Sequence, residues 1–220
     1  MLANLLLDEL DKELEKRGHR FCRYADDCNV YVRSRAAGER VMASMTRFLE
    51  KRLRLRVNRT KSAVAYVEER KFLGYRLLAG GRLTIAPESL ERAKGRIREI
   101  TRRNRGVSLE RMISELNSFL TGWVTYFRHA SAKGHLQRLD EWIRRKLRCV
   151  RLKQRKRGRS VTAFLVSHGV PRWRARTLGG SGRGWWRLAG GPPAAEAMSI
   201  RWFKDRQLVT LTERYLALQN

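Results

Sequence analysis

Two kinds of hydrophobic pattern alternate over the first 86 residues. Leucines recur every fourth position from Leu2 to Leu14 with charged residues between them, which predicts an amphipathic helix over 2–17 ended by Gly18. A similar pattern predicts a second helix over 37–54. Runs rich in aromatic and β-branched residues predict short strands at 20–24, 28–32, 55–57 and 63–66. Gly80-Gly81 predicts the turn of a further hairpin over 72–85.

The pattern becomes purely helical after Pro87. Helices are predicted over 88–103, 108–128 and 132–154, with Ser108 as an N-cap, and short links between them predict a small bundle. Shorter helices follow at about 161–168, 171–178, 195–203 and 208–218, separated by glycines and prolines. The chain is therefore predicted to have an α+β fold with three domains: the mixed region 1–86, the helical region 87–155 and the small helical region 156–220.

The large excess of basic residues indicates a polyanionic partner. The chain has 49 Lys+Arg and 21 Asp+Glu, a net charge of +28, and residues 81–220 carry most of it with 31 basic and 10 acidic side chains. Such a field attracts polyphosphates. Ribosomal or histone-like binding is the alternative, but a hydrophobic content of 42% favours folded units over a basic tail.

The basic residues are densest between positions 144 and 159, where no acid occurs. Because self-repulsion in such a run is costly without a polyanion, we interpret it as a phosphate-contacting stretch. Its members are Arg144, Arg145, Lys146, Arg148, Arg151, Lys153, Arg155, Lys156, Arg157 and Arg159.

Tryptophans lie among arginines beyond this run. Aromatic rings interleaved with arginine can stack on bases, and they can equally form the core of a small domain. Trp186 and Trp202 are interpreted as core, whereas Trp173 and Trp185 stay open between the two roles and are candidate nucleic-acid contacts.

Several other kinds of chemistry find no support. The three cysteines form no Cys-x-x-Cys pair and the four histidines are scattered, so neither a disulfide framework nor a zinc site is indicated. No transmembrane run, signal peptide or lipidation motif occurs, so no membrane partner and a cytoplasmic location are expected.

The strongest chemical signal is Tyr24-Ala25-Asp26-Asp27, between the two predicted strands 20–24 and 28–32. Adjacent carboxylates are ligands that Mg²⁺ prefers, together with substrate phosphates, and paired metal ions stabilise phosphoryl transfer. A solvated turn is the alternative interpretation of two such acids.

Further motifs precede and follow these acids, and their order and spacing are informative. Leu2-Ala3-Asn4 comes before them; after them come Asn58-Arg59-Thr60-Lys61-Ser62, Phe72-Leu73-Gly74-Tyr75, Leu116-Asn117, Gly122-Trp123 and Tyr126-Phe127. The whole chain resembles the reverse transcriptases, or maturases, encoded by bacterial group II introns. Retron enzymes share the Tyr-Ala-Asp-Asp box, and the segments beyond about residue 90 narrow the resemblance to group II intron proteins. It implies a palm portion in 1–86, a thumb or maturase-specific domain in 87–155 and a nucleic-acid-binding region in 156–220.

The resemblance also implies roles for particular residues. Asp26 and Asp27 would be catalytic Mg²⁺ ligands, with Tyr24 and Ala25 beside the primer end. Lys61 would approach the triphosphate, although it can equally be a surface lysine. Phe72, Leu73, Gly74 and Tyr75 would form the primer-grip hairpin.

The implied function is RNA-directed DNA synthesis by nucleotidyl transfer, with intron RNA binding that assists splicing and mobility. The implied partners are group II intron RNA, an RNA template with a DNA primer, and target DNA in the bacterial cytosol or nucleoid.

One departure from the family pattern sets a second expectation. In the family, the fingers, the first half of the palm and a further aspartate precede the segment that resembles Leu2-Ala3-Asn4, so this chain resembles a C-terminal half. It is expected to be inactive as a polymerase by itself, and a separate N-terminal half is a candidate partner. A non-catalytic RNA-binding maturase is the alternative function. No C-terminal endonuclease domain is expected, because its paired cysteines are missing.

Overall fold

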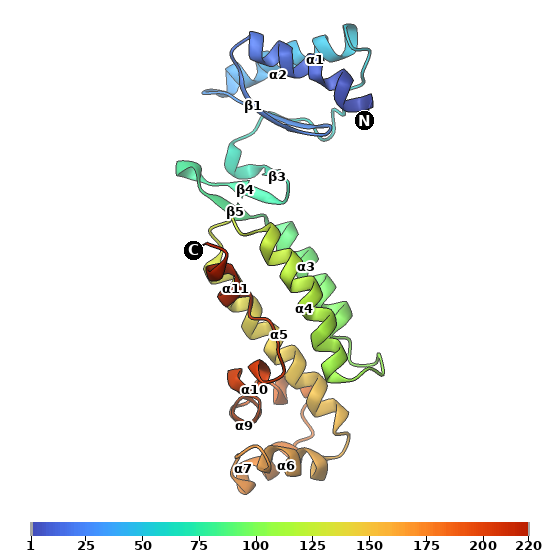
Figure 1. Ribbon diagram of the computed structural model, residues 1–220, viewed down its shortest axis with the longest axis vertical. Helices are drawn as coiled ribbons and strands as arrows, with labels where there is room; N and C mark the ends of the chain where they lie inside the picture. Colours follow the sequence, from blue (N-terminus) through green and yellow to red (C-terminus); the bar gives the residue numbers. More distant parts are fainter. Residues whose placement is uncertain (1, 220) are drawn as a thin grey trace. The chain divides into compact units, whose positions relative to one another are not determined.

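The computed structural model describes residues 2–219 and divides the chain into two compact units, with the boundary after Arg82 (Figure 1). The mixture of helices with small antiparallel sheets confirms the predicted α+β class. The further boundary predicted between residues 155 and 156 stays a prediction. No helix in the described part of the chain is long and apolar enough to cross a membrane.

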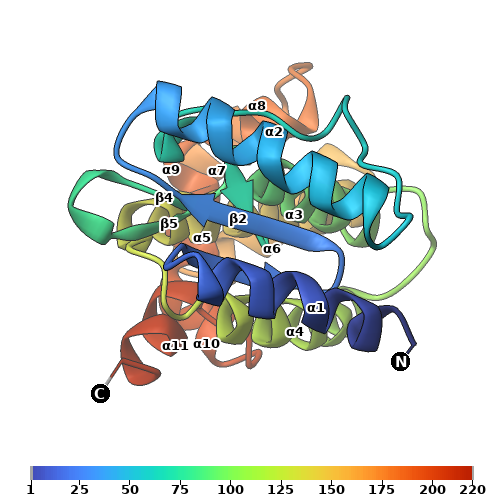
Figure 2. The same ribbon diagram turned by 90° about the horizontal axis from the view of Figure 1, so that it is seen from above.

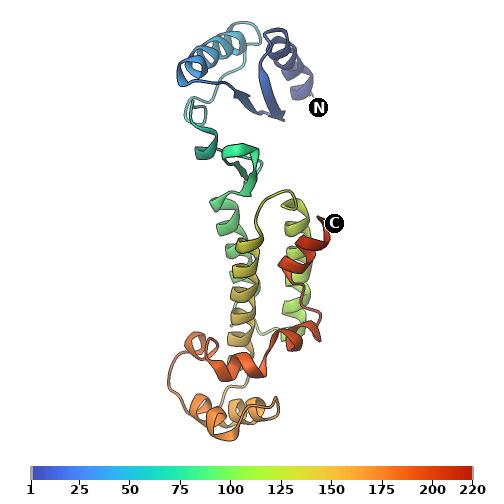
Figure 3. The ribbon, with the colours of Figure 1, turned by 90° about the vertical axis from the view of Figure 1, so that its left-hand side faces the viewer.

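The first unit begins with two helices packed on a hairpin. Helix α1 (Leu2–Lys16), strands β1 (Arg20–Tyr24) and β2 (Asp27–Tyr31), and helix α2 (Arg35–Lys51) confirm four predicted elements, with β2 one residue earlier than expected. Both helices lie on one face of the hairpin, as Figures 1 and 3 show, and Figure 2 shows them running along β2. Their shared core consists of Leu10, Leu14 and Met45, with Phe21 and Val30 of the strands packed against it.

The predicted strands 55–57 and 63–66 are wrong, since neither segment forms a strand. Their β-type residues find no strand to pair with. Asn58 instead organises a turn, accepting hydrogen bonds at its Oδ1 from the backbone N–H groups of Thr60 and Lys61. Val64 packs so tightly on α2 that a Cβ added to Gly38 would lie 2.6 Å from its Cγ1.

Short strands follow a 3₁₀ turn, η1 (Val67–Glu69). Strands β3 (Lys71–Phe72), β4 (Tyr75–Leu77) and β5 (Leu83–Ile85) form an antiparallel sheet in the order β3-β4-β5. The predicted turn at Gly80-Gly81 is confirmed as η2 (Ala79–Gly81), where both glycines have a φ of 77°. Leu73-Gly74 forms an additional tight turn, so what was predicted as one strand is two.

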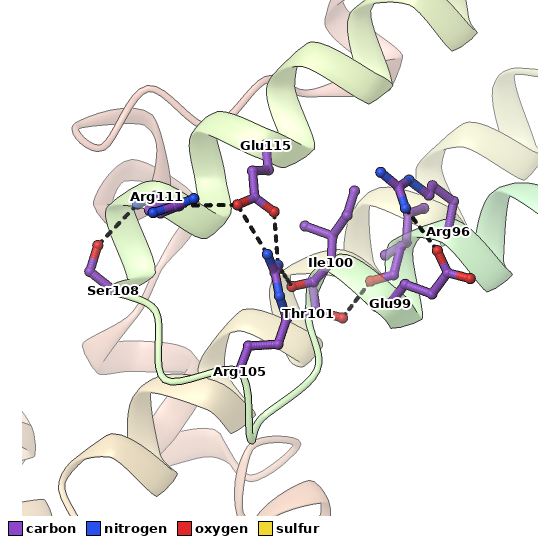
Figure 4. Close-up of polar contacts among 9 residues, drawn as sticks. Arg96, Glu99, Ile100, Thr101, Arg105, Ser108, Arg111 and Glu115 are labelled. Carbon is purple, nitrogen blue, oxygen red and sulfur yellow. Dashed lines mark hydrogen bonds and ion pairs between the residues drawn. The ribbon is translucent and has the colours of Figure 1, made fainter.

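Three long helices form the frame of the second unit, as predicted: α3 (Pro87–Ile100), α4 (Leu109–Tyr126) and α5 (Lys133–Gln154). The Ser108 hydroxyl caps α4 by accepting from the N–H of Arg111 at 3.1 Å, which confirms the predicted N-cap. Figure 4 shows how Arg105 fixes the α3–α4 link: it donates to the Ile100 carbonyl at 2.7 Å and pairs with Glu115 at 2.8 Å.

Six short helices complete this unit: α6 (Gly158–Val166), α7 (Arg172–Gly179), α8 (Trp185–Leu188), α9 (Pro192–Ala197), α10 (Ile200–Lys204) and α11 (Leu211–Ala217). Helix α8 was not predicted. The single helix predicted over 195–203 is wrong, because the chain leaves the helical conformation at Met198 and the Ser199 hydroxyl caps a new helix by accepting from the N–H of Trp202.

Helix α11 returns to pack against α4 and α5 (Figures 1 and 3). The Asp140 carboxylate of α5 is buried and accepts hydrogen bonds from the backbone N–H groups of Leu211 and Thr212 at 2.8 and 3.0 Å. The Tyr215 hydroxyl donates to the Ala130 carbonyl at 2.7 Å. Polar contacts therefore fasten the last helix to the frame.

Candidate catalytic turn and nucleic-acid interface

The two adjacent carboxylates lie at the tip of the β1–β2 hairpin. Ala25 and Asp26 form its two-residue loop, in which Ala25 has a left-handed φ of 52°, and Asp27 opens β2 opposite Tyr24. Both aspartates are exposed. Within residues 2–219 neither carboxylate takes part in a hydrogen bond or an ion pair, so both are free to bind a cation.

Arg23 holds this turn in place, a role that the sequence reading missed. Its guanidinium pairs with Asp11 of α1, with Nε 2.7 Å from Oδ1, and its Nη1 donates to the Ala25 carbonyl at 2.9 Å. The Arg23 and Asp11 side chains are only 14% and 22% exposed. One half-buried ion pair thus connects the helix to the left-handed residue beside Asp26, which fixes the path of the loop.

The strand alternation sorts the hairpin into two faces. Phe21 and Val30 point to the helices, whereas the opposed pairs Cys22–Asn29 and Tyr24–Asp27 share the other face. Tyr24 is 63% exposed there. The Tyr24 ring and the Asp27 carboxylate are therefore presented together on the face that the helices leave open.

The donor set at this turn suits Mg²⁺. A hard cation of this kind is bound by one or two carboxylates together with waters and substrate phosphates, and the turn offers two unpartnered carboxylates on adjacent residues. The described residues contain no group of three or more His, Cys, Asp or Glu side chains that could form a closed metal site. The turn therefore fits a metal shared with a phosphate ligand or a further carboxylate.

Lys61 is exposed and belongs to the Asn58 turn. Its N–H donates to the Asn58 side chain, and its carbonyl accepts from Nη2 of Arg70 at 2.7 Å. The backbone of the segment is thus well fixed, while the ammonium group has no partner among residues 2–219. The structure does not join Lys61 to Asp26 or Asp27 by any contact.

The predicted primer-grip residues form the tip of the β3–β4 hairpin. Phe72 pairs with Tyr75, and the two-residue loop between them has φ values of 52° at Leu73 and 78° at Gly74. Left-handed geometry at both positions matches the twist of a tight hairpin but strains a leucine. Leu73 is 37% exposed at this tip.

Four members of the basic run, three in α5 and one at its C-cap, hold the helices that follow. Arg145 donates to the Trp186 carbonyl at 3.1 Å and stacks over its ring at 4.2 Å. Arg148 donates to the Met198 carbonyl at 3.0 Å. Arg151 and Arg155 both stack on the Phe164 ring, with guanidinium carbons 5.4 and 4.6 Å from the ring centroid. We call these four the docking arginines: Arg145, Arg148, Arg151 and Arg155.

Other cations of the run remain at the surface. Arg144 and Lys146 are half-buried, and Lys146 lies 5.2 Å from the Trp142 ring. The remaining four are exposed and form no ion pair with any residue between 2 and 219. We call them the exposed cations: Lys153, Lys156, Arg157 and Arg159. The basic run is therefore divided between internal contacts and a solvent-facing surface.

Burial and neighbouring positive charges both disfavour the charged forms of three of these cations. Burial and then the charge of Arg144 lower the pKa of Arg148, and burial and then Arg155 lower the pKa of Arg151. Burial and then Arg98 likewise lower the pKa of Lys146. No acid occurs between Glu141 and Glu196, so the sequence itself supplies no counter-charge in this stretch. A polyanion would relieve this repulsion.

The tryptophans differ in their surroundings. Trp202 is 8% exposed and lies under Arg206, in agreement with its interpretation as core. Trp186 is 38% exposed and stacked on Arg145, so it is not an interior residue. Trp185 is half-buried, whereas Trp173 is 72% exposed.

Comparison with known families gives a match for two segments of the chain. Residues 1–77 match the reverse transcriptase (RNA-dependent DNA polymerase) family, and residues 90–165 match the maturase-specific domain of group II introns. The comparison with individual curated proteins gave no match. Reverse transcriptase followed by a maturase-specific domain is the order that the sequence motifs indicated, and the two matches cover most of residues 1–165. The chain belongs to the group II intron reverse transcriptase and maturase family.

Proposed function

We propose that the Asp26-Asp27 turn takes part in RNA-directed DNA synthesis while the basic second unit binds intron RNA. The family match implies a reverse transcriptase and maturase role, with intron RNA and nucleic-acid substrates as partners. The finer assignment to residues is our proposal. The observation that carries it is the pair of free carboxylates on a loop fixed by Arg23, in the segment that matches the reverse transcriptase family.

In this proposal the family's divalent metal is Mg²⁺, held by Asp26 and Asp27. When bound, it would activate the primer hydroxyl and stabilise the leaving pyrophosphate. Tyr24 lies on the face of Asp27 and would bound the primer end, with Ala25 next to it in the loop. Phe72, Leu73, Gly74 and Tyr75 would contact the primer, and Lys61 the triphosphate. These contacts position the reacting atoms, which supplies much of the rate in phosphoryl transfer.

Two carboxylates do not complete a two-metal site, and the described residues contain no cluster of three or more ligands. We therefore propose that a further carboxylate comes from additional polypeptide, either a separate chain or more sequence of the same protein. This supports a non-catalytic RNA-binding maturase as the second candidate function for the 220 residues acting alone. In both cases the nucleic acid would be contacted by the four exposed cations. It would also be contacted by Arg144, Lys146, Trp173 and Trp185.

Primer extension and assisted splicing, measured side by side, test the division. The 220-residue chain is assayed alone and with a polypeptide that carries the fingers and first palm half of a group II intron enzyme. We expect synthesis only in the second mixture, and we expect Asp26→Asn and Asp27→Asn to abolish it while intron binding and splicing persist. Glu91→Gln, at an exposed helix position, is the matched control for loss of one carboxylate.

Three outcomes contradict parts of the proposal. Synthesis that survives both aspartate changes would remove the turn from catalysis. Loss of splicing in a folded Asp26→Asn protein would show that the carboxylates serve RNA binding as well. Synthesis by the chain alone, abolished by Asp26→Asn, would show that two carboxylates suffice and would overturn the need for further polypeptide.

A further inference from the structure

Helices α6 and α7 form a rigid helical hairpin. They lie side by side in Figures 1 and 3, and their backbones touch near Gly158 and Gly179, where an added Cβ on either residue would overlap a carbonyl oxygen of the other. The Thr162 hydroxyl donates to the Gly158 carbonyl at 3.0 Å and lies 3.4 Å from the Ala175 carbonyl. Such close backbone packing leaves little freedom for one helix to move against the other.

Trp173 is presented on the outside of this hairpin. It is 72% exposed, and in the part of the chain that the structure describes its indole contacts no other ring and lies under no cation. Trp202, by contrast, is 8% exposed and covered by Arg206 at 3.6 Å from its ring centroid. A single exposed apolar side chain needs no explanation by itself, so its neighbours decide its meaning.

The arginines of α7 are sorted around this indole. Arg174 forms two hydrogen bonds with Glu196 of α9, at 2.8 and 2.7 Å, and is thereby committed to the fold. Arg172 precedes the indole and Arg176 follows it by three positions; both are exposed and have no ion pair within residues 2–219. Residues three or four apart are neighbours on a helix surface, so Arg176 lies beside both Trp173, three positions before it, and Arg172, four positions before it.

The surrounding chain makes an anionic ligand the matching partner. Residues 142–195 contain 15 Lys and Arg and no Asp or Glu, and both helices of the hairpin lie inside this stretch. An acidic ligand that lacked a planar group would use the guanidinium groups and leave the indole in water. A nucleotide with an exposed base face uses both, because its phosphate pairs with arginine while its base stacks on the ring.

We propose that Arg172, Trp173 and Arg176 form a stacking site for one unpaired nucleotide of a single-stranded nucleic acid. The inference rests on the proposed function in taking nucleic acid as the ligand, and it adds that the strand must be unpaired at this point. In a duplex the base faces are already stacked on one another and are closed to the indole. The guanidinium groups of Arg172 and Arg176 then pair with phosphates next to the stacked base.

The test measures binding of the full chain to labelled oligonucleotides of about ten nucleotides, a length within the usual site size of stacking platforms. Single-stranded RNA, single-stranded DNA and a blunt duplex of the same sequence are compared across a salt series. Trp173→Ala should weaken single-strand binding by about 5- to 150-fold, the usual range for one stacked base, and should leave duplex binding unchanged. Trp173→Phe should restore most of the loss. The RNA and DNA arms show which strand the site prefers.

The arginines give an independent readout. Arg172→Ala with Arg176→Ala should lower the salt slope on single strands by about 1.4, whereas Trp173→Ala should lower affinity at constant slope. Arg183→Ala with Arg187→Ala, two exposed arginines outside α7, is the matched control for charge. Thermal unfolding should be unaffected by Trp173→Ala, since the ring is already largely in water.

The outcomes separate this inference from the proposed function. If the unaltered chain binds neither duplex nor single strands, the nucleic-acid role fails and the stacking site with it. If it binds both and Trp173→Ala changes neither, only the stacking site is refuted. Equal losses on duplex and single strand would also refute it, because they would show a general polyanion surface.

Discussion

The division of the basic run into docking arginines and exposed cations makes opposite predictions for two sets of alanine substitutions. Replacing the docking arginines should unfold or undock the C-terminal helices, with loss of RNA binding as a consequence. Replacing the exposed cations should weaken RNA binding directly and leave the fold intact. The two sets remove the same formal charge from the same run, so each is the matched control of the other.

The expected stability changes follow from the contacts. Arg148→Ala removes a charged hydrogen bond to the carbonyl of Met198, a residue with no exposed surface, and such a bond contributes about 1.5–3 kcal/mol. It also removes a stacking contact 5.8 Å from the Phe203 ring, worth about 0.5 kcal/mol or more. Relief of repulsion with Arg144 offsets part of this loss. We expect a net loss of about 1–3 kcal/mol of unfolding free energy for this one change.

Arg148→Lys separates charge from shape. It keeps a cation on the run but loses the planar group that reaches the carbonyl and the ring together, so it should recover little of the stability. Each exposed cation, in contrast, should change stability by no more than about 0.5 kcal/mol when replaced. If all four contact phosphate, the salt slope should fall by about 3, at roughly 0.7–0.9 per contact.

Urea unfolding measures the change in unfolding free energy, and binding of structured RNA across a salt series measures the change in salt slope. The reasoning would be refuted if the docking-arginine variants kept full stability while losing RNA affinity, since those side chains would then be phosphate contacts. An unchanged salt slope after replacement of the exposed cations would equally remove them from the interface.

Three further predictions concern single sites. Arg23→Ala should cost about 2–3 kcal/mol of unfolding free energy by leaving Asp11 without its partner, and a double-mutant cycle of the two residues should show coupling above about 1 kcal/mol; additive effects would disprove the clamp. Asp140→Ala should cost about 2–3 kcal/mol and speed amide hydrogen exchange in α11, because two helix-start N–H groups lose their acceptor; unchanged exchange would contradict this. Burial raises the pKa of the Cys28 thiol from 9.0 to about 11, so the folded state retains a proton that the unfolded state releases, and stability should fall as the pH rises through that window. Cys28→Ala should flatten that decline in urea titrations, and an equal decline in both proteins would exclude the thiol as its cause.

Local patterns predicted the longer helices and the β1–β2 hairpin well. The leucine repeat of α1 and the strands beside Asp26 depend on neighbours close in the sequence, and the register of a two-residue hairpin follows from its turn. The segments around Leu55 and Ala63 show the limit of this approach. Their β-type residues have the composition of strands, but a strand also needs a pairing partner, which composition does not reveal.

Which cations of the basic run face solvent and which make internal contacts could not be predicted from the sequence, for a different reason. The basic run 144–159 predicts an interface by its charge alone, yet whether one arginine faces solvent or Phe164 depends on helices that come later in the chain. The role of Arg23 could not be predicted for the same reason, because its partner Asp11 lies on another element. The spacing of the docking arginines, three or four residues apart, is a signal that they share one helix face. It becomes informative only when the aromatic groups that cover that face are known.

The touching backbones of Gly158 and Gly179 also constrain how this hairpin can evolve. At most tight contacts, a larger side chain can be accommodated by trimming its neighbour, so substitutions accumulate in compensating pairs. Here each glycine faces the other's backbone, which no substitution can trim. A substitution at either glycine would therefore require the two helices to pack differently or to separate. Among descendants that keep this hairpin, the two glycines should therefore persist together, while the surface of α7 remains free to change with its ligand.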